Sequence, residues 1–452
     1  LDGAALRTVA VIGPNADEAR IGGGGSSYLE PPYAVSPLEG LRAALADVEV
    51  AYERGCDNYG ATLPALRAEF LTPARGEGHG LLGEFFATRE GATEAKAKAA
   101  AERVDASFGM IQPPPEVSRG TFSARWTGSL DVPTTGRHTL QVQATGECRV
   151  YVAGSLVAEA QPGARGMFGL PVRAATATVF LRAGEAADMR IEFAQDAEAP
   201  VAMLSLHMAH TPEPDDRIQR AVDLARRADV AIVCAGMSTG FESEGHDRPD
   251  MRLPGPQEDL IRAVAAANPR TIVVLNCGSP VEMPWLDDVP AVLLAHYGGQ
   301  ETGNALADLL LGRANPSGRL TATYPRRYED NPASINFPGE REVLYGERIY
   351  VGYRYYDAKN VEPLFPFGHG LSYTTFSYGD VEAPDEAPLG EPVEVAVQVT
   401  NAGPRAGAEV VQVYVRDVEA SVDRPPKELK GFAKVMLQPG ESGVARWTLD
   451  RR

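Results

Sequence analysis

Long apolar runs are missing from this chain of 452 residues. The longest, "TIVVLNCG" at 271–278 and "VPAVLLAHY" at 289–297, are far shorter than the roughly 20 residues that a membrane-spanning helix needs. We therefore expect a soluble protein with no membrane partner.

Positive charge is also scarce. The chain carries 43 basic and 61 acidic residues, which gives a formal net charge of −18 at pH 7. A surface with this balance repels a phosphate backbone, so nucleic acid is excluded as a partner.

Cysteine is rare, and the four residues of this type are dispersed along the chain. Two of them, Cys234 and Cys277, lie within apolar stretches typical of strands. This pattern predicts buried, unreactive thiols and no disulfide or metal framework. It favours a reducing, cytoplasmic compartment over a periplasmic or secreted one.

The two ends of the chain do not look like natural termini. The first residues, "LDGAALRTVAVIG", show no signal peptide and enter an expected strand almost at once. The last, "GVARWTLDRR", stop inside a strand-like alternation. We expect a piece of a longer polypeptide, and the oligomeric state is not predicted.

Hydrophobic residues make up 44% of the chain, which is enough for several cores, and the length predicts two to four domains. Apolar runs typical of strands alternate with amphipathic stretches typical of helices. This alternation predicts a parallel sheet covered by helices on both faces. The expected strands are 7–13, 48–55, 229–236, 271–278 and 291–297, and the expected helices are 36–46, 217–228, 256–268 and 301–312.

The pattern changes twice along the chain. Residues 78–210 read as short alternating strands, which predicts an all-β module inserted into a discontinuous α/β domain of residues 1–77 and 211–330. An aromatic-rich connector follows at 331–378. Residues 379–452 return to strand alternation and predict a small, incomplete β-sandwich.

The glycine-rich stretch "GGGGSS" at 22–27 follows the first expected strand. It lacks the lysine of a phosphate-binding P-loop, and the prolines of "YLEPPYAVSP" prevent the immediate helix that a dinucleotide site requires. We interpret it as a flexible loop rather than a nucleotide site. Such loops lie at the sheet edge where open α/β folds build their sites.

A second loop, "GFESEGHDR" at 240–248, places five ionisable side chains within nine residues, directly after the expected strand 229–236. Two interpretations stay open on composition alone: a solvated acidic loop steadied by an Asp247–Arg248 pair, or a catalytic site. A carboxyl group held near a fixed cation with partial exclusion of water is suited to donate a proton at neutral pH. Glycosidic cleavage needs such an acid together with a second carboxylate, and no other loop shows a comparable isolated acid.

Four long stretches resemble the C-terminal half of a glycoside hydrolase family 3 β-glucosidase. They are "RTVAVIGPNAD…IGGGGSSYLEPPYAVSPLEGLRAAL", "GFESEGHDRPDMRLPGPQEDLI", "HYGGQETGNALADLLLGRANPSGRLTATYP" and "YVGYRYYDAKNVEPLFPFGHGLSYTTFSY". The inserted β module is similar to a PA14 domain, and the tail "VTNAGPRAGAEVVQVYVRD…KELKGFAKVMLQPGES" is similar to a fibronectin type III-like domain. The resemblance implies an α/β fold: an (α/β)6 sandwich with the inserted PA14-like module and the C-terminal fibronectin type III-like domain.

The resemblance also implies roles for single residues. Glu244 matches the acid/base of a retaining exo-glycosidase. Asp247 and Arg248 match the Asp-Arg pair of the motif, which is expected to orient the loop. Glu242 aligns one step outside the motif and is assigned, with His246, a supporting role. The nucleophile of the family is an aspartate on a (β/α)8 barrel, which is absent here. Since retaining hydrolysis needs two carboxyl groups, we expect this chain to be inactive alone.

The implied substrate is a terminal, non-reducing β-D-glucosyl residue on an aryl or oligosaccharide partner, cleaved without a metal or organic cofactor. In the PA14-like module, "PGARGMFGLP" at 162–171 offers Met167 and Phe168 as apolar contacts for a sugar or aryl face. Trp126 is expected to be core. The alternatives are a β-xylosidase, a natural-product deglycosylase, and a non-catalytic carbohydrate-binding protein.

Overall fold

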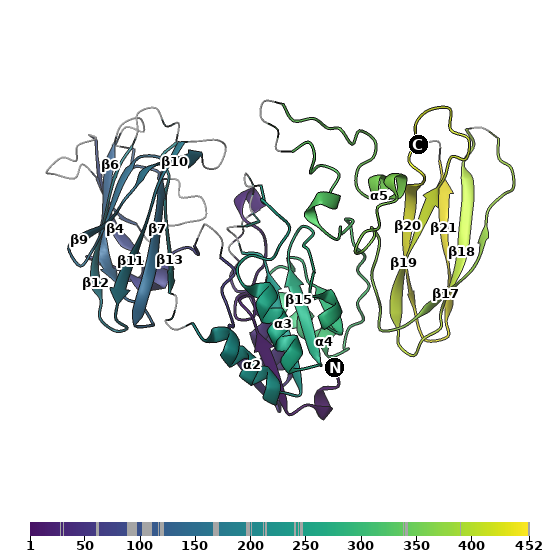
Figure 1. Ribbon diagram of the computed structural model, residues 1–452, viewed down its shortest axis with the longest axis horizontal. Helices are drawn as coiled ribbons and strands as arrows, with labels where there is room; N and C mark the ends of the chain where they lie inside the picture. The colour runs from purple at the N-terminus through teal and green to yellow at the C-terminus, as the bar shows by residue number, and fades with distance from the viewer. Residues whose placement is uncertain are drawn as a thin grey trace.

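The fold is known from a computed structural model, in which three bodies lie in a row (Figure 1). A β module lies at one end, an α/β body in the middle, and a second β-sandwich at the other end. The structure describes residues 1–27, 29, 31–59, 63–87, 97–101, 111–115, 117, 122–165, 171–195, 199, 201–210, 212, 215–238, 241, 242, 244, 247–337, 339, 342–388 and 390–450.

The α/β body is built on one parallel sheet, with strand order β16-β15-β14-β1-β2. Most of its residues are apolar and buried, because helices cover both faces. All of the strands expected from the sequence are confirmed. They are β1 (Thr8–Ile12), β2 (Glu49–Glu53), β14 (Val230–Gly236), β15 (Thr271–Asn276) and β16 (Ala291–Leu294).

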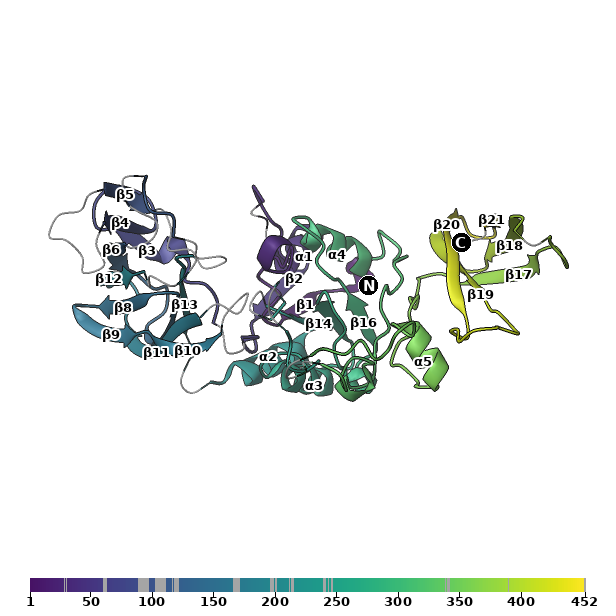
Figure 2. The same ribbon diagram turned by 90° about the horizontal axis from the view of Figure 1, so that it is seen from above.

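Two pairs of helices cover the sheet from opposite sides (Figure 2). Helices α1 (Pro37–Ala44) and α4 (Thr302–Leu310) form a core with Val9 and Val11 of β1. Helices α2 (Arg217–Arg227) and α3 (Gln257–Ala267) form another with Ala10 and Ile12. Alternate residues of one strand therefore supply different cores, as the geometry of a strand requires.

The sheet has five strands in the described part of the chain, whereas an (α/β)6 sandwich has six. Residues 320–325 follow α4 but turn toward the connector. Tyr324 donates its N–H to the Phe365 carbonyl (2.9 Å) and accepts from the Leu364 N–H (2.8 Å). The N–H and carbonyl of Tyr324 therefore bond to the connector, and they do not add a sixth strand beside β16. The mixed α/β architecture is confirmed, with this difference in strand number.

In the part of the chain that the structure describes, the β module is a sandwich of two antiparallel sheets, one of seven strands and one of four. The larger contains β3 (Leu71–Pro73), β4 (Leu81–Phe86), β5 (Ala97–Ala101), β6 (Ser123–Leu130), β8 (Glu147–Val152), β9 (Ser155–Glu159) and β12 (Ala187–Ala194). The smaller contains β7 (Gly136–Ala144), β10 (Gln161–Arg165), β11 (Pro171–Leu181) and β13 (Leu204–His210). Because β3 pairs with β6, the module includes residues that precede the expected boundary at 78.

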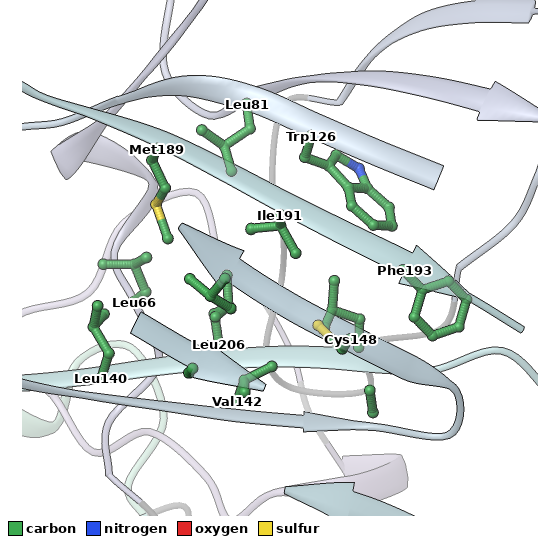
Figure 3. Close-up of a cluster of buried hydrophobic side chains, with 14 of the residues drawn as sticks. Leu66, Leu81, Trp126, Leu140, Val142, Cys148, Met189, Ile191, Phe193 and Leu206 are labelled. Atoms are coloured by element: carbon green, nitrogen blue, oxygen red, sulfur yellow. The ribbon is translucent and has the colours of Figure 1, made fainter. Parts of the chain in front are cut away.

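The core of this module lies between the two sheets (Figure 3). Ile191 and Phe193 of β12 face Leu140 of β7 and Leu206 of β13 across it. Trp126 is buried, with an edge-on contact to Phe85 at a centroid distance of 6.0 Å. Its expected place in the core is confirmed.

The connector holds the short helix α5 (Tyr353–Lys359) and leads into the second sandwich. One sheet of this sandwich contains β17 (Phe376–Glu382), β18 (Val393–Asn401) and β21 (Ser442–Leu449), and the other contains β19 (Gly407–Val415) and β20 (Glu428–Leu437). Five short 3-10 turns complete the described elements: η1 (Gly3–Ala5), η2 (Gly25–Ser27), η3 (Ala68–Phe70), η5 (Leu286–Asp288) and η6 (Tyr328–Asp330).

All four cysteines are buried and unbridged, as the sequence predicted. Burial raises the pKa of each thiol to about 12, which keeps the sulfurs protonated and unreactive. Among the described helices, none combines the length and the apolar character that a membrane crossing demands.

The contact between α1 and α4 depends on glycine. A Cβ at Gly40 would overlap the carbonyl oxygen of Gly303, so we expect Gly40→Ala to lower the free energy of unfolding of the α/β body by about 1–3 kcal/mol. Hydrogen exchange of peptides from β1 and β14 in urea measures this loss. Gly318 has open space around its Cβ position, and Gly318→Ala should change the same free energy by less than about 0.5 kcal/mol. Equal effects of the two substitutions would contradict the packing explanation.

Candidate active site

An open cleft of about 480 Å³ lies at the carboxyl edge of the parallel sheet. Strands β16, β15, β14 and β1 are consecutive neighbours, so the loops that follow them meet at this edge. Each of these loops contributes to the lining. The lining residues are Gly23, Gly24, Ser27, Phe241, Glu242, Glu244, Asp247, Arg248, Gly278, Ser279 and Tyr297.

Glu242 is the most heavily bonded side chain of the cleft. Its carboxylate accepts hydrogen bonds from the N–H of Gly278 (2.6 Å), from the N–H of Ser279 (3.0 Å) and from the Ser279 hydroxyl. The Tyr297 hydroxyl donates a further bond. Only 11% of the side chain is exposed. These bonds tie the loop after β14 to the loops after β15 and β16.

Arg248 completes this cluster. Its Nη1 lies 3.5 Å from Oε1 of Glu242 and donates to the Ser279 hydroxyl (2.9 Å) and the Pro280 carbonyl (3.1 Å). The sequence interpretation paired Arg248 with Asp247. In the described residues its ion pair is with Glu242, while the side chain of Asp247 is exposed. The half-buried carboxylate of Glu242 has the greater need for a counter-charge.

Glu244 has a different environment. Its side chain is exposed at the cleft, and its Oε2 accepts a hydrogen bond from the N–H of Ser26 (3.0 Å). Hydrogen bonds from the Ser26 hydroxyl and N–H hold the pKa of Glu244 below its ordinary value. From the sequence, a proton-donating carboxyl group was associated with partial exclusion of water. The structure shows an exposed one that favours the charged form.

A buried network of amides supports the loop that carries both glutamates. Gln257 donates to the Gly236 carbonyl (2.9 Å) and accepts from the Gly236 N–H (2.8 Å). The side-chain amide of Asn58 donates to the side-chain Oδ1 of Asn15 (2.8 Å) and to the backbone carbonyl of Gly236 (3.3 Å). Gly236 has φ +146°, and a Cβ there would overlap the carbonyl of Asn276. The chain can therefore leave β14 in this direction only with glycine.

The structure brings Glu242, Glu244, Asp247 and Arg248 to one cleft. His246, Met167 and Phe168 lie outside the described residues. Among the residues described, no three His, Cys, Asp or Glu side chains are placed to hold a metal ion.

Sequence reasoning missed Ser26, Ser279 and Tyr297. Ser26 and Ser279 follow predicted parallel strands and Tyr297 ends one, so all three lie toward the same edge of the sheet, and this common position was the available signal. Clusters of charged residues marked the candidate site in the sequence, and these three residues are uncharged. Their role appears only when the loops are brought together.

The family description "Glycosyl hydrolase family 3 C-terminal domain" matches residues 1–373. The chain belongs to glycosyl hydrolase family 3. A second description, "Fibronectin type III-like domain", matches residues 409–452, which lie in the C-terminal sandwich.

Relatives within family 3 are similar over almost the whole chain. A beta-glucosidase of Rhizobium radiobacter is 40% identical over 453 residues, which cover 97% of this chain and 53% of that protein. A probable beta-glucosidase I of Aspergillus clavatus is 36% identical over 471 residues, which cover 99% of this chain and 55% of that protein. The crystal structure of a beta-glucosidase from Kluyveromyces marxianus in complex with glucose matches with a TM-score of 0.89 and 34% identity, covering 100% of this chain and 55% of that one.

The chain thus spans about half the length of the curated relatives that it matches. The fold and the family are shared along that half.

Tyr297 provides a test of the cluster around Glu242. Burial and the neighbouring carboxylate raise its pKa, so the phenol stays protonated as a donor. We expect Tyr297→Phe to lower the free energy of unfolding by about 1–3 kcal/mol. Since the raised pKa belongs to the folded state, this contribution is complete below about pH 10, where the unfolded phenol is protonated, and declines at higher pH.

Denaturant unfolding of the wild type and the variant between pH 7 and pH 11 measures this difference. Tyr345 is 82% exposed, so Tyr345→Phe is the matched control and should change the free energy by less than about 0.5 kcal/mol. A difference between Tyr297→Phe and wild type that grows above pH 10 would contradict the assignment of Tyr297 as a donor.

Proposed function

We propose that this chain is the C-terminal part of a retaining, exo-acting β-glucosidase and supplies its acid/base residue, Glu244. The observation that carries the proposal is an exposed carboxyl group in an open cleft at the sheet edge, within a family 3 chain. The beta-glucosidase names of the relatives support the reaction and the glucoside substrate.

The contacts favour Glu244 over Glu242 as the proton donor. Both oxygens of Glu242 are occupied by donors from the protein, and Arg248 lies beside them. Because these donors occupy its oxygens, the carboxylate of Glu242 has no access to a departing oxygen. Glu244 faces the cleft, so it can reach a substrate there. Glu242, Asp247, Arg248 and the neighbouring His246 are assigned to the support of the loop.

The reaction has two steps. In the first, the Glu244 carboxylic acid gives its proton to the glycosidic oxygen while the bond from C1 to that oxygen breaks and the nucleophile bonds to C1. In the second, the Glu244 carboxylate takes a proton from water, whose oxygen bonds to C1 as the bond to the nucleophile breaks. Glucose leaves, and both carboxyl groups return to their starting states.

The nucleophile is assigned to an aspartate on a (β/α)8 barrel in the half of the protein that this chain does not contain. A barrel placed over the cleft would exclude water from Glu244 and raise its pKa toward the value that a proton donor needs. The lowered pKa in this chain agrees with an uncovered site. The chain alone is therefore expected to be inactive.

The connector offers a surface for such a domain. Four large apolar side chains of the connector are between 59% and 85% exposed: Ile335, Leu344, Tyr345 and Val351. Exposed apolar patches usually mark a surface that contacts another protein or domain. Figure 1 shows this part of the connector above the same end of the sheet as η2. This exposure supports contact with the missing half.

The inserted β module is proposed to be a PA14 domain that shapes the aglycone side of the site, with Met167 and Phe168 as apolar contacts. Its two-sheet architecture and its place between two parts of one α/β body support this. The domain division proposed is 1–77 with 211–330, then 78–210, 331–378 and 379–452, with the β module extended to include β3. A xyloside substrate gains no support from the relatives, and neither does a purely binding function.

The central test is Glu244→Gln in the full-length protein. Turnover of glucosides with poor leaving groups should fall by about 10²- to 10⁴-fold, because the departing oxygen needs a proton. Formation of the glycosyl-enzyme from activated aryl glucosides should be retained, because their leaving groups need none. Steady-state and burst kinetics on both substrate types measure the two effects.

Glu159 is the matched control, because it pairs with Arg149 on the surface of the β module, away from the cleft. Glu159→Gln should leave unchanged both the turnover of glucosides with poor leaving groups and the formation of the glycosyl-enzyme from activated aryl glucosides. A small and equal effect of Glu244→Gln on the two substrate types would overturn the assignment.

A further inference from the structure

The glycine-rich loop of residues 22–27 is in direct contact with the loop that carries the two glutamates. The N–H of Gly24 donates to the backbone carbonyl of Glu242 (2.9 Å). A Cβ at Gly23 would come within 3.1 Å of the same oxygen, so the close approach favours glycine. The Ser27 hydroxyl donates to the Gly24 carbonyl (3.0 Å) and shapes the turn. These contacts show that the loop is a docked part of the cleft.

The docked loop presents Ser26 to Glu244. The backbone N–H of Ser26 lies 3.0 Å from Oε2 of Glu244, and the serine hydroxyl is a second partner of the carboxylate. Hydrogen bonds to the charged form of a carboxyl group stabilise that form and fix its direction. A general base must be ionised and within reach of the water that it activates.

We propose that Ser26 is a positioning residue that holds Glu244 as the oriented general base of the second reaction step. The inference rests on the proposed function, since it gives Ser26 a part in the chemistry of Glu244. It also assigns a role to the "GGGGSS" stretch, which the sequence suggested was a flexible loop.

The other charged or titratable groups that line the cleft in the described residues are Glu242, Asp247, Arg248 and Tyr297. Glu242, Arg248 and Tyr297 are bonded to one another or to Ser279. The lowered pKa of Glu244 has its causes in the Ser26 hydroxyl and N–H. Removing the hydroxyl therefore changes the titration of Glu244 more than a change elsewhere in the same loop does.

The first arm of the test measures this titration in the present chain. With ¹³C-labelled glutamate, the side-chain carboxyl resonance of Glu244 is assigned from its loss in Glu244→Gln and followed against pH. We expect Ser26→Ala to raise the pKa of Glu244 and Ser26→Thr to restore it. Ser155→Ala is the control: it removes an exposed serine hydroxyl from β9, away from the cleft, and should leave this pKa unchanged. An unchanged pKa in Ser26→Ala, or an equal rise in Ser155→Ala, overturns the proposal.

The second arm uses the full-length protein. Ser26→Ala should move the basic limb of the pH profile of kcat/KM upward, because the acid form of Glu244 persists to higher pH. It should also lower kcat for activated aryl glucosides by about 2- to 10-fold, the loss expected for one hydrogen bond to the base. Ser26→Thr should reverse both effects, which a merely structural role of the loop would not produce.

The two arms separate the two proposals. If Glu244→Gln abolishes turnover of poor leaving groups but Ser26→Ala leaves the basic limb in place, the proposed function stands and the role of Ser26 is overturned. If Glu244→Gln has no effect while the titration still depends on Ser26, the proposed function fails, and the catalytic role of Ser26 fails with it.

Discussion

The cleft depends on the carboxylate of Glu242. This one group accepts hydrogen bonds from the loops after β15 and β16, while the backbone carbonyl of the same residue accepts one from the glycine-rich loop after β1. A half-buried carboxylate that loses its donors carries a large desolvation cost. The four irregular loops at this edge are therefore held in a common arrangement, and Glu244 takes its position from it.

The sheet makes this interaction possible. Parallel strands end at the same edge, and the order β16-β15-β14-β1 places the four loops next to one another although they are up to about 270 residues apart in the chain. Beneath them, Gln257, Asn58 and Asn15 satisfy backbone groups that the strand ends leave open. Gly236 allows the backbone to turn away from β14 without a steric overlap. The support under the loop is buried and polar, whereas the cleft above it is open.

Several parts of this arrangement could be predicted from local patterns. The runs of buried apolar residues in β14 and β15, and the amphipathic stretches that become α2 and α3, depend on residues close in the chain. The position of Glu244 at the cleft followed from its place after β14. The ion pair of Arg248 with Glu242 was not foreseen, because Asp247 is the nearest carboxylate in sequence, whereas the side chain of Glu242 is largely buried. The strand number also differed, because Tyr324 finds its backbone partners in the connector, beyond the reach of a local pattern.

The sequence by itself determined the family, the alternation of strands and helices, the presence of two β modules, and the segment that carries the acidic site. All of these are properties of contiguous residues, since periodicity and motifs act over short distances. Only the tertiary structure decided which carboxylate is saturated and which is exposed, and that an uncharged serine 218 residues away in the chain contacts Glu244. Burial and hydrogen bonding across loops are long-range properties, because they depend on which strand ends become neighbours.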